Sequence, residues 1–318
     1  MSITQDIKHR ALELGFDLVG VTDAAPIDTE QKELLAAWLE SGYAGQMTYM
    51  QKNFDKRINP AKLLRNARSV IAAGLNYKPL RKNLEKPNTT RPCGKVASYA
   101  QYQDYHPFVK QQLHRLVDFI SSVAGSGHRY KICVDSAPVA ERTLAVRAGL
   151  GFIGRNHLLI HPTLGPQMFL GEVITTVKLR SDEAIGADCS DCDNCIAACP
   201  TGALLPDGQF DARKCINYLT IEHEGKLPLE LRKIIGDRLF GCEECIVSCP
   251  YHKNAPVCKN ADLKRHCDRA KLDLHEILAL TDESFAVKFT DSVINRSGLN
   301  RLKRNARICL ENIALHGR

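Results

Sequence analysis

The sequence lacks the signals of a membrane or exported protein. None of its apolar runs approaches the roughly 20 residues that a membrane-spanning helix needs. The N-terminal segment MSITQDIKHRALELGFDLVGV carries early charges, has no apolar signal-peptide core and contains no twin arginine. We therefore expect a cytoplasmic protein with no membrane partner.

Two common cofactor motifs are also missing. The chain contains no Gly-x4-Gly-Lys-Ser/Thr and no Cys-x3-Cys-x2-Cys. These absences disfavour a phosphate-binding loop and a radical S-adenosylmethionine site. If the protein performs redox chemistry, we expect its electrons to come from an external donor such as flavodoxin or ferredoxin.

Acidic residues are scarce in two stretches of an otherwise average composition. The net charge is +7, and residues 56–95 hold eleven Lys or Arg but a single acid, Glu85. Residues 292–318 hold six basic residues and one acid, Glu311. Such stretches are either solvated surface or a site for a polyanion. One Trp and nine Tyr disfavour extensive base stacking but not phosphate contacts.

Cysteine, in contrast, is abundant. Of thirteen cysteines, eight fall between Cys189 and Cys249 in metal-ligand spacing, and in a reducing compartment such clusters bind metal. We interpret the others as small, buried or half-buried residues: Cys93, Cys133, Cys258, Cys267 and Cys309.

The first cysteine run is Cys189-x2-Cys192-x2-Cys195-x3-Cys199-Pro200. This is the spacing of bacterial ferredoxins, in which three close cysteines bind one 4Fe–4S cluster and the fourth binds the other. A zinc site is the weaker alternative.

The second run, Cys242-x2-Cys245-x3-Cys249-Pro250, has the same ending but one cysteine fewer, and Cys215 can supply it. Pseudo-twofold symmetry then predicts a crossed assignment of two 4Fe–4S clusters. Cluster one takes Cys189, Cys192, Cys195 and Cys249; cluster two takes Cys199, Cys215, Cys242 and Cys245.

The pattern of elements predicts an α+β or three-layer α/β protein in three parts. Residues 1–179 mix helices (2–14, 30–41, 107–124) with strands (16–22, 69–76, 96–100, 130–135), and the strands 157–162 and 168–177 read as a hairpin. A Pro- and Lys-rich loop spans 78–94. The cysteine module occupies 180–260, and a basic tail with helices at 270–280, 283–290 and 298–315 occupies 261–318.

Taken together, several segments resemble the epoxyqueuosine reductase family. They include VDSAPVAERTLAVRAGLGFIGRNHLLIHP (134–162), GPQMFLGEVITT (165–176), CINYLTIEH (215–223) and SVINRSGLNRLKRNA (292–306), besides both cysteine runs. The resemblance implies a nitroreductase-like cobalamin-binding domain, a ferredoxin-like module with two 4Fe–4S clusters and short HEAT-like C-terminal helices. It implies reduction of epoxyqueuosine at the tRNA wobble position to queuosine, with the epoxide oxygen leaving as water.

Within that resemblance, Asp135 matches the family's proton donor in its DSxPxxER motif. Taken alone, an Asp at a strand end is better read as a cap for the helix that begins near Pro138. The surrounding motif favours the catalytic role, and burial beside a planar corrin would raise the Asp135 pKa and keep it protonated.

The resemblance also implies ligand contacts. Eight positions match the family's cobalamin site, and several of them would contact the cofactor through backbone atoms. They are Arg57, Ser98, Asp135, Asn156, Leu159, Leu170, Asn217 and Tyr218. Those expected to face the tRNA anticodon stem-loop are His223, Arg296, Arg301, Lys303 and Arg304. Because no Asp-x-His-x-x-Gly is present, we expect base-off cobalamin without a protein His below cobalt.

Some positions depart from the family pattern, and two other functions compete. The second run is followed by Tyr251-His252 instead of Trp-Asn, which puts local contacts in doubt. A reductive dehalogenase-like enzyme would use similar cofactors on a small substrate but needs no basic stretches. A plain electron-transfer ferredoxin would leave residues 1–179 unexplained. We expect a monomer.

Overall fold

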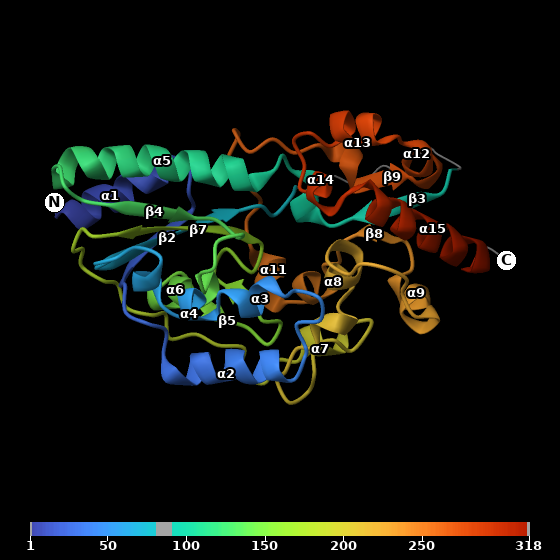
Figure 1. The fold of residues 1–318 in the computed structure, drawn as a ribbon, viewed down its shortest axis with the longest axis horizontal. Coiled ribbons are helices and arrows are strands. Elements are labelled where there is room, and N and C mark those ends of the chain that lie inside the picture. The colour runs from blue at the N-terminus through green and yellow to red at the C-terminus, as the bar shows by residue number, and fades with distance from the viewer. Residues whose placement is uncertain (1, 81–90, 317–318) are drawn as a thin grey trace.

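The computed structural model describes residues 2–80 and 91–316 (Figure 1). A layer built on a four-stranded sheet lies at one end, and the cysteine module and the C-terminal helices lie at the other. Most of the predicted loop 78–94 lies outside the described residues.

The elements follow one another as mixed helices and strands. The helices are α1 (Ile3–Glu13), α2 (Thr29–Glu40), α3 (Tyr49–Lys52), α4 (Phe54–Arg57), α5 (Tyr105–Ala124), α6 (Glu141–Arg147), α7 (Asn194–Ala197), α8 (Ile216–Ile221), α9 (Leu229–Ile235), α10 (Glu244–Val247), α11 (Pro250–Asn254), α12 (Leu274–Ala279), α13 (Asp282–Lys288), α14 (Ile294–Ser297) and α15 (Leu299–His316). The strands are β1 (Leu18–Asp23), β2 (Ser69–Asn76), β3 (Cys93–Val96), β4 (Tyr130–Cys133), β5 (Phe152–Ile153), β6 (Leu159–Ile160), β7 (Met168–Thr175), β8 (Arg238–Phe240) and β9 (Lys271–Asp273).

The main sheet has the order β1-β2-β7-β4, and every neighbouring pair is antiparallel. β2 is buried along its whole length, which explains why SVIAAGLN reads as an apolar run rather than an alternating one. The predicted α+β class is confirmed.

Helices cover both faces of this sheet. α5 is amphipathic, and its buried residues Val109, Leu113, Leu116 and Ile120 recur every three or four positions and pack with α1 on one face. Leu113 is 0% exposed, so truncating it to Ala would cost about 2–5 kcal/mol. The other face carries α6, whose Leu144 meets Ile174 of β7.

The predicted hairpin of 157–162 with 168–177 is wrong. β6 pairs with β5, whereas β7 enters the main sheet between β2 and β4. The physical reason is that β7 is apolar on both faces, so burial in the centre of a sheet outweighs pairing with its neighbour in sequence.

A second sheet joins segments that are distant in the sequence. β3 lies between β8 of the cysteine module and β9 of the tail, parallel to the first and antiparallel to the second. The predicted strand 96–100 is shifted, since its residues 98–101 form a 3₁₀ turn. The predicted helix 270–280 starts as β9 because residues 271–273 pair with β3.

The tail packs through an apolar core of its own. Leu302, Ala306 and Cys309 of α15 face β8, α12 and α13. Within the described residues, no helix is long and apolar enough to cross a membrane.

Candidate functional site

One cavity in the cysteine module is ringed by cysteines from both runs. It has a volume of about 230 Å³ and lies between the loop before α7, the start of α11 and the β5–β6 hairpin. Its lining comprises Cys189, Cys192, Cys195, Cys249, Arg155, Asn156, Ile160, Pro250 and Tyr251. The structure therefore brings together the four cysteines predicted for cluster one, including the one from the distant second run.

The other four cysteines form a second group. Burial, followed by the neighbouring Cys242 and Cys199, raises the pKa of Cys215 to about 11. Burial and then Cys215, Cys242 and Cys199 raise the pKa of Cys245 in the same way. Such mutual effects require proximity, and Cys195 of the first set also acts on Cys245, so the second group adjoins the first.

These groups are wider than a mononuclear site. In the described part of the chain, no group of three or more His, Cys, Asp or Glu side chains is arranged to hold one metal ion. A cubane cluster is held by a wider ring of thiolates because each cysteine binds a different iron.

Local contacts fix the second run. Gly241 has φ +77°, and a Cβ there would come within 2.7 Å of Ala97 and 3.0 Å of Asn217 Oδ1, so the turn requires glycine. Asn217 clamps Cys242 by accepting from its N–H (3.0 Å) and donating to its carbonyl (3.2 Å). Thr220 accepts the Gly241 N–H at 3.0 Å.

Asp135 lies just beyond the end of β4, in a strained backbone conformation. Its φ is +49°, which a non-glycine residue adopts rarely and often at functional sites. Its backbone N–H donates to Glu141 Oε1, at the start of α6. Asp135 therefore does not cap α6 with its side chain, and its carboxylate is left for other contacts.

That carboxylate ends a hydrogen-bonded chain. Asp135 Oδ2 lies 3.0 Å from His106 Nε2, and His106 Nδ1 lies 2.6 Å from Asp104 Oδ1. Asp104 also caps α5 by accepting the His106 N–H. The ring of Tyr105 stacks on those of His106 and Phe169, with both centroid distances 4.1 Å. The start of α5 thus holds the imidazole in place between two acids.

The expectation of a raised Asp135 pKa is wrong for this arrangement. Burial raises the Asp135 pKa, but the hydrogen bond and charge of His106 and the charge of Arg296 lower it below its usual value. Burial lowers the His106 pKa, but its bonds to Asp104 and Asp135 outweigh this and raise it. These two shifts favour an imidazolium at His106 that is hydrogen-bonded to a carboxylate at Asp135.

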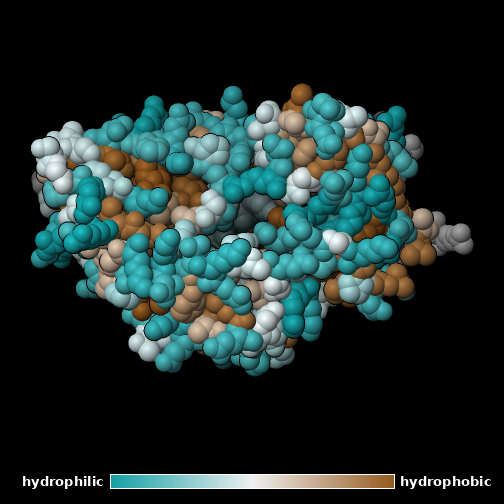
Figure 2. Space-filling model, viewed as in Figure 1, coloured by the Kyte–Doolittle hydropathy of each residue, from teal (hydrophilic) through white to brown (hydrophobic). Residues whose placement is uncertain are grey.

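Ionisable side chains from four other elements surround Asp135. Its charge acts on Tyr49 of α3, Arg57 of α4 and Glu222 at the end of α8, while Arg296 of α14 faces it from the tail. Figure 2 shows a hollow at the centre of the face where these elements meet in Figure 1. Water reaches the Asp135 side chain, which is 55% exposed.

The residues predicted to contact cobalamin divide into two kinds. Four of them already form side-chain hydrogen bonds within the protein. Ser98 donates to Glu243, Asn156 donates to the Cys245 carbonyl, Asn217 donates to the Cys242 carbonyl, and Tyr218 accepts the Gln46 N–H. Leu159 and Leu170 pack beneath α6. Arg57 donates to the Val139 carbonyl at 3.4 Å but keeps a buried, unpaired Nε, and the Asp135 carboxylate is bound to His106 and partly exposed.

Unsatisfied polar atoms adjoin the same segments. Among the described residues, Arg57 Nε, His157 Nε2 and Gln167 Oε1 are buried without a hydrogen-bond partner. His157 follows Asn156, and Gln167 donates to Ser98 at 3.0 Å. Because such atoms cost stability when unpaired, they fit a bound group rich in amides and phosphate.

Two of the residues predicted to bind tRNA are engaged within the protein. Arg304 donates to the carbonyls of His223 (2.7 Å) and Leu219 (2.5 Å), and Arg301 donates to the Ile221 carbonyl and to Glu224. Arg296 is exposed and faces Asp135, whereas His223 packs edge-on against Tyr218. Lys303 is half-buried on α15.

Sequence reasoning missed Asp104, His106, Glu141 and Glu172 as members of the site. Asp104 and His106 lie in SYAQYQDYH (98–106), a further segment that resembles the family, and Glu141 lies in the DSxPxxER motif, so the sequence carried a signal for these three residues. For Glu172, the only signal in the sequence was the presence of an acid within the apolar strand MFLGEVIT.

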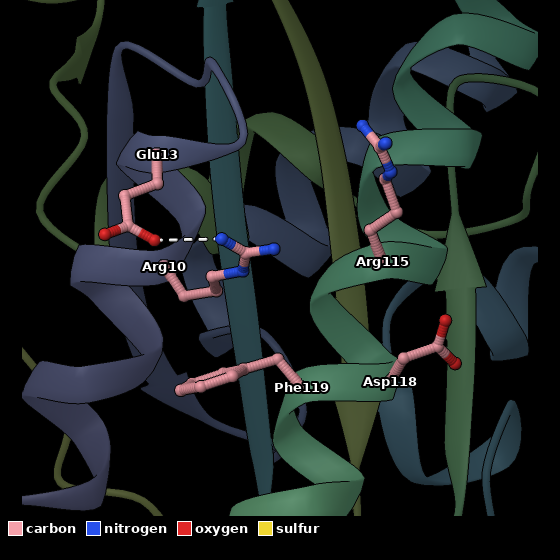
Figure 3. A pocket seen from close by; sticks show the side chains of 5 residues that line it. All are labelled: Arg10, Glu13, Arg115, Asp118 and Phe119. Atoms are coloured by element: carbon pink, nitrogen blue, oxygen red, sulfur yellow. Dashed lines mark hydrogen bonds and ion pairs between the residues drawn. The ribbon is translucent and has the colours of Figure 1, made fainter.

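A separate cavity of about 460 Å³ lies between α1 and α5, away from this site. Figure 3 shows its lining residues Arg10, Glu13, Arg115, Asp118 and Phe119, with an ion pair of 2.9 Å between Arg10 and Glu13. None of the predicted site residues lines it.

Two family models match the chain. The one described as "Epoxyqueuosine reductase QueG, DUF1730" covers residues 57–136. The one described as "4Fe-4S double cluster binding domain" covers residues 188–252, the segment that holds the seven cysteines of the two runs and Cys215.

Similar proteins match almost the whole chain. The epoxyqueuosine reductase of Vibrio cholerae is 37% identical over 315 residues, covering 98% of this chain and 83% of its own. A crystal structure of epoxyqueuosine reductase with an epoxyqueuosine-modified tRNA-Tyr stem loop is 31% identical, with a TM-score of 0.91 and coverage of 99% and 84%. A Bacillus subtilis epoxyqueuosine reductase, solved with its aspartate-bearing catalytic loop swung out of the active site, is 30% identical, with a TM-score of 0.90 and coverage of 99% and 84%.

Proposed function

The chain belongs to the epoxyqueuosine reductase family, and from this premise we propose that it reduces epoxyqueuosine in tRNA to queuosine. The reaction takes two electrons and two protons, opens the epoxide and releases its oxygen as water. The observation that carries the proposal is the position of Asp135 and His106, which face a hollow beside two assembled sets of four cysteines.

The electron path rests on the double 4Fe–4S cluster domain at residues 188–252. We assign Cys189, Cys192, Cys195 and Cys249 to one cluster and Cys199, Cys215, Cys242 and Cys245 to the other. Asn156 lines the first site and donates to the Cys245 carbonyl at 3.2 Å, so a single side chain touches both. Electrons enter from an external donor such as flavodoxin or ferredoxin.

Cobalamin is the group that we assign to the hollow, bound base-off. Arg57 supplies a buried, unpaired N–H, and Gln167 supplies an unpaired amide oxygen next to Ser98. Asn156, Leu159, Leu170, Asn217 and Tyr218 complete the predicted lining. When bound, the group supplies a strongly reducing cobalt centre that transfers the electrons.

The protein's own contribution to the chemistry is proton delivery. An alkoxide is a poor leaving group, so the epoxide oxygen must be protonated as its bond to carbon breaks. His106 holds the proton, Asp135 shares it through the 3.0 Å hydrogen bond, and Asp104 keeps the imidazole oriented. The acid is therefore the Asp135–His106 pair, and Asp135 is the member that faces the hollow.

The finer architecture belongs to the same proposal. We assign the main-sheet layer to a nitroreductase-like cobalamin-binding domain and α12–α15 to a short HEAT-like region. The tail faces the anticodon stem-loop through Arg296 and Lys303, while Arg301, Arg304 and His223 hold the loop beneath it. Phosphate contacts of this kind orient the RNA rather than read its bases.

Mass analysis of tRNA nucleosides tests the function in cells. In a strain lacking this protein, epoxyqueuosine should accumulate and queuosine should disappear; the wild-type gene should restore queuosine. An unchanged queuosine content in the strain that lacks the protein would contradict the proposed function.

Bound cobalamin separates the enzyme from a plain ferredoxin. After anaerobic reconstitution, we expect about one cobalamin per chain, identified by absorbance. A reductive dehalogenase-like enzyme would also bind cobalamin but would leave epoxyqueuosine tRNA unchanged.

A further inference from the structure

Glu172 is a carboxylic acid buried in the middle of the main sheet. It is 0% exposed and lies on β7, where the alternation of side chains puts it with Leu170 and Ile174 on the face covered by α6. The surrounding layer is apolar and includes Leu144. An unpaired charge in such a layer is costly, so the carboxyl needs either a partner or a proton.

Its neighbours are acids. Both Glu172 oxygens are buried, and among the described residues no N–H group donates to them; the side-chain hydrogen bond of Glu172 is with the carboxyl of Glu141. The charged groups that face it are Glu141 of α6 and Asp135 beyond β4, and the thiol of Cys133 lies opposite on β4. Burial and then Glu141 and Asp135 raise the Glu172 pKa well above its usual value. Two adjacent carboxyls in an apolar site are stable when they share a proton.

Glu141 connects this acid to the candidate active site. Its Oε1 accepts the backbone N–H of Asp135. Burial and the Asp135 charge raise the Glu141 pKa above its usual value, against the lowering effects of the Asp135 N–H, Arg142 and His106. A carboxyl whose pKa is raised in this way takes up a proton more readily than an exposed one.

We propose that Glu172, as a neutral acid, shares a proton with Glu141 and thereby stores the second proton that reloads Asp135 during turnover. The inference rests on the proposed function, because only a reaction that consumes two protons at one oxygen needs such a store. Glu172 is a positioning and proton-holding residue, since it does not face the hollow itself.

The stoichiometry requires two proton sources or one that is refilled. Two C–O bonds break, one C=C π bond and two O–H bonds form, and two electrons arrive through the clusters. The Asp135–His106 pair supplies the first proton as the epoxide opens. Glu141 and Glu172 return a proton to Asp135, which passes it to the departing hydroxyl, and the store refills from water.

Infrared spectroscopy tests the protonation of Glu172 without substrate. The holoenzyme at neutral pH should show the C=O stretch of a buried neutral carboxyl, shifted in D₂O. Glu172→Gln should remove the band, as should Glu172→Met, which adds no polar amide to the apolar layer. Glu13→Gln, at an exposed acid paired with Arg10, should retain it. A wild-type spectrum without the band would overturn the proposal.

Kinetics test the role of the stored proton. With clusters and cobalamin at wild-type content, Glu172→Gln should slow single-turnover formation of queuosine about 10-fold or more, within the range of general-acid effects. The loss should grow above neutral pH, where refilling is slower, and a purely structural defect would be independent of pH. Wild-type rates at every pH would overturn the proposal. Failure of the wild-type enzyme to form queuosine would instead remove the proposed function, and the infrared band would still decide the state of Glu172.

Discussion

At the scale of single residues, the site is a balance of opposing charges around Asp135. Burial alone would favour its neutral form, but His106 and Arg296 favour the carboxylate. The pKa of His106 is raised in turn, because Asp104 and Asp135 lie at its two ring nitrogens. The result is a proton held on an imidazole and shared with a carboxylate that faces the hollow.

Replacing Asp135 with Asn should abolish most of the activity while preserving the fold. Asn also tolerates the left-handed conformation required at φ +49°, but it cannot pass on a proton. We expect single-turnover conversion of epoxyqueuosine tRNA to fall by about 10²–10⁴-fold. Iron and cobalamin contents should stay at wild-type levels, and a fully loaded variant with normal turnover would exclude the catalytic role.

Asp104→Asn should shift the pH dependence of the same reaction. Asn still caps α5, but the variant loses a negative charge that raises the His106 pKa. The His106 pKa falls, so the imidazolium is lost at lower pH and the alkaline limb of the rate profile should move to lower pH. Asp118→Asn, on the exposed surface of α5, is the matched control. Identical profiles for wild type and Asp104→Asn would contradict the relay.

The spacing of the cysteines predicted two sets of four, and the first set, Cys189, Cys192, Cys195 and Cys249, lines one cavity. The pairing of Asp104, His106 and Asp135 could not be predicted in the same way, because it depends on how the start of α5 packs over the end of β4. The Asp135 pKa was predicted in the wrong direction for this reason: burial was considered, but the imidazole partner was not.

At the scale of elements, short helices present the cysteines to two sites. α7 carries Cys195 and α10 carries Cys245, and each run ends in a Cys-Pro step whose cysteine the proposed assignment gives to the other cluster. Asn217 and Gly241 fix the second run against β8 and α8.

Serine variants test the crossed assignment. Cys215→Ser should remove one cluster, and Cys189→Ser should remove the other, each lowering bound iron by about half. Electron paramagnetic resonance of the reduced proteins should show different surviving signals. Cys267→Ser, at an exposed cysteine outside both sets, should leave iron unchanged. Loss of the same signal in both variants would contradict the assignment.

Most elements with strong periodicity were predicted close to their observed bounds, as for α1, α5 and β2. The errors concern pairing between distant segments. β7 joins β2 and β4 instead of its neighbour β6, and residues 271–273 pair with β3 before α12 begins. Local sequence carries little information about such partners, because the strand β7 is apolar on both faces.

At the scale of the whole molecule, the proposed RNA site rests on the basic tail. The net charge is +7, and the charge of Arg296 in the tail acts on Asp135. The loop that contains His223 is held between α8 and α15 by Arg301 and Arg304. In the proposed site these two arginines hold that loop in place, while Arg296 and Lys303 contact phosphate.

Neutral substitutions at basic residues of the tail should distinguish those that contact tRNA phosphate from those that stabilise the fold. Arg296→Gln and Lys303→Gln should each weaken tRNA binding and reduce the slope of log affinity against log salt by about one per lost phosphate contact. Arg304→Gln should chiefly lower thermal stability, because it loses bonds to the carbonyls of Leu219 and His223. Lys178→Gln, exposed beyond the end of β7, is the control. Unchanged slopes in the tail variants would move the RNA site to residues 56–95.

The central claim is that this chain converts epoxyqueuosine in tRNA to queuosine with electrons delivered through its clusters. The most direct test is a single turnover of the anaerobically reconstituted, reduced protein with epoxyqueuosine tRNA, followed by mass analysis of the nucleosides. We predict one queuosine per two electrons consumed, and none from protein that lacks the clusters. Protein fully loaded with both clusters and cobalamin that leaves epoxyqueuosine unchanged would contradict the account.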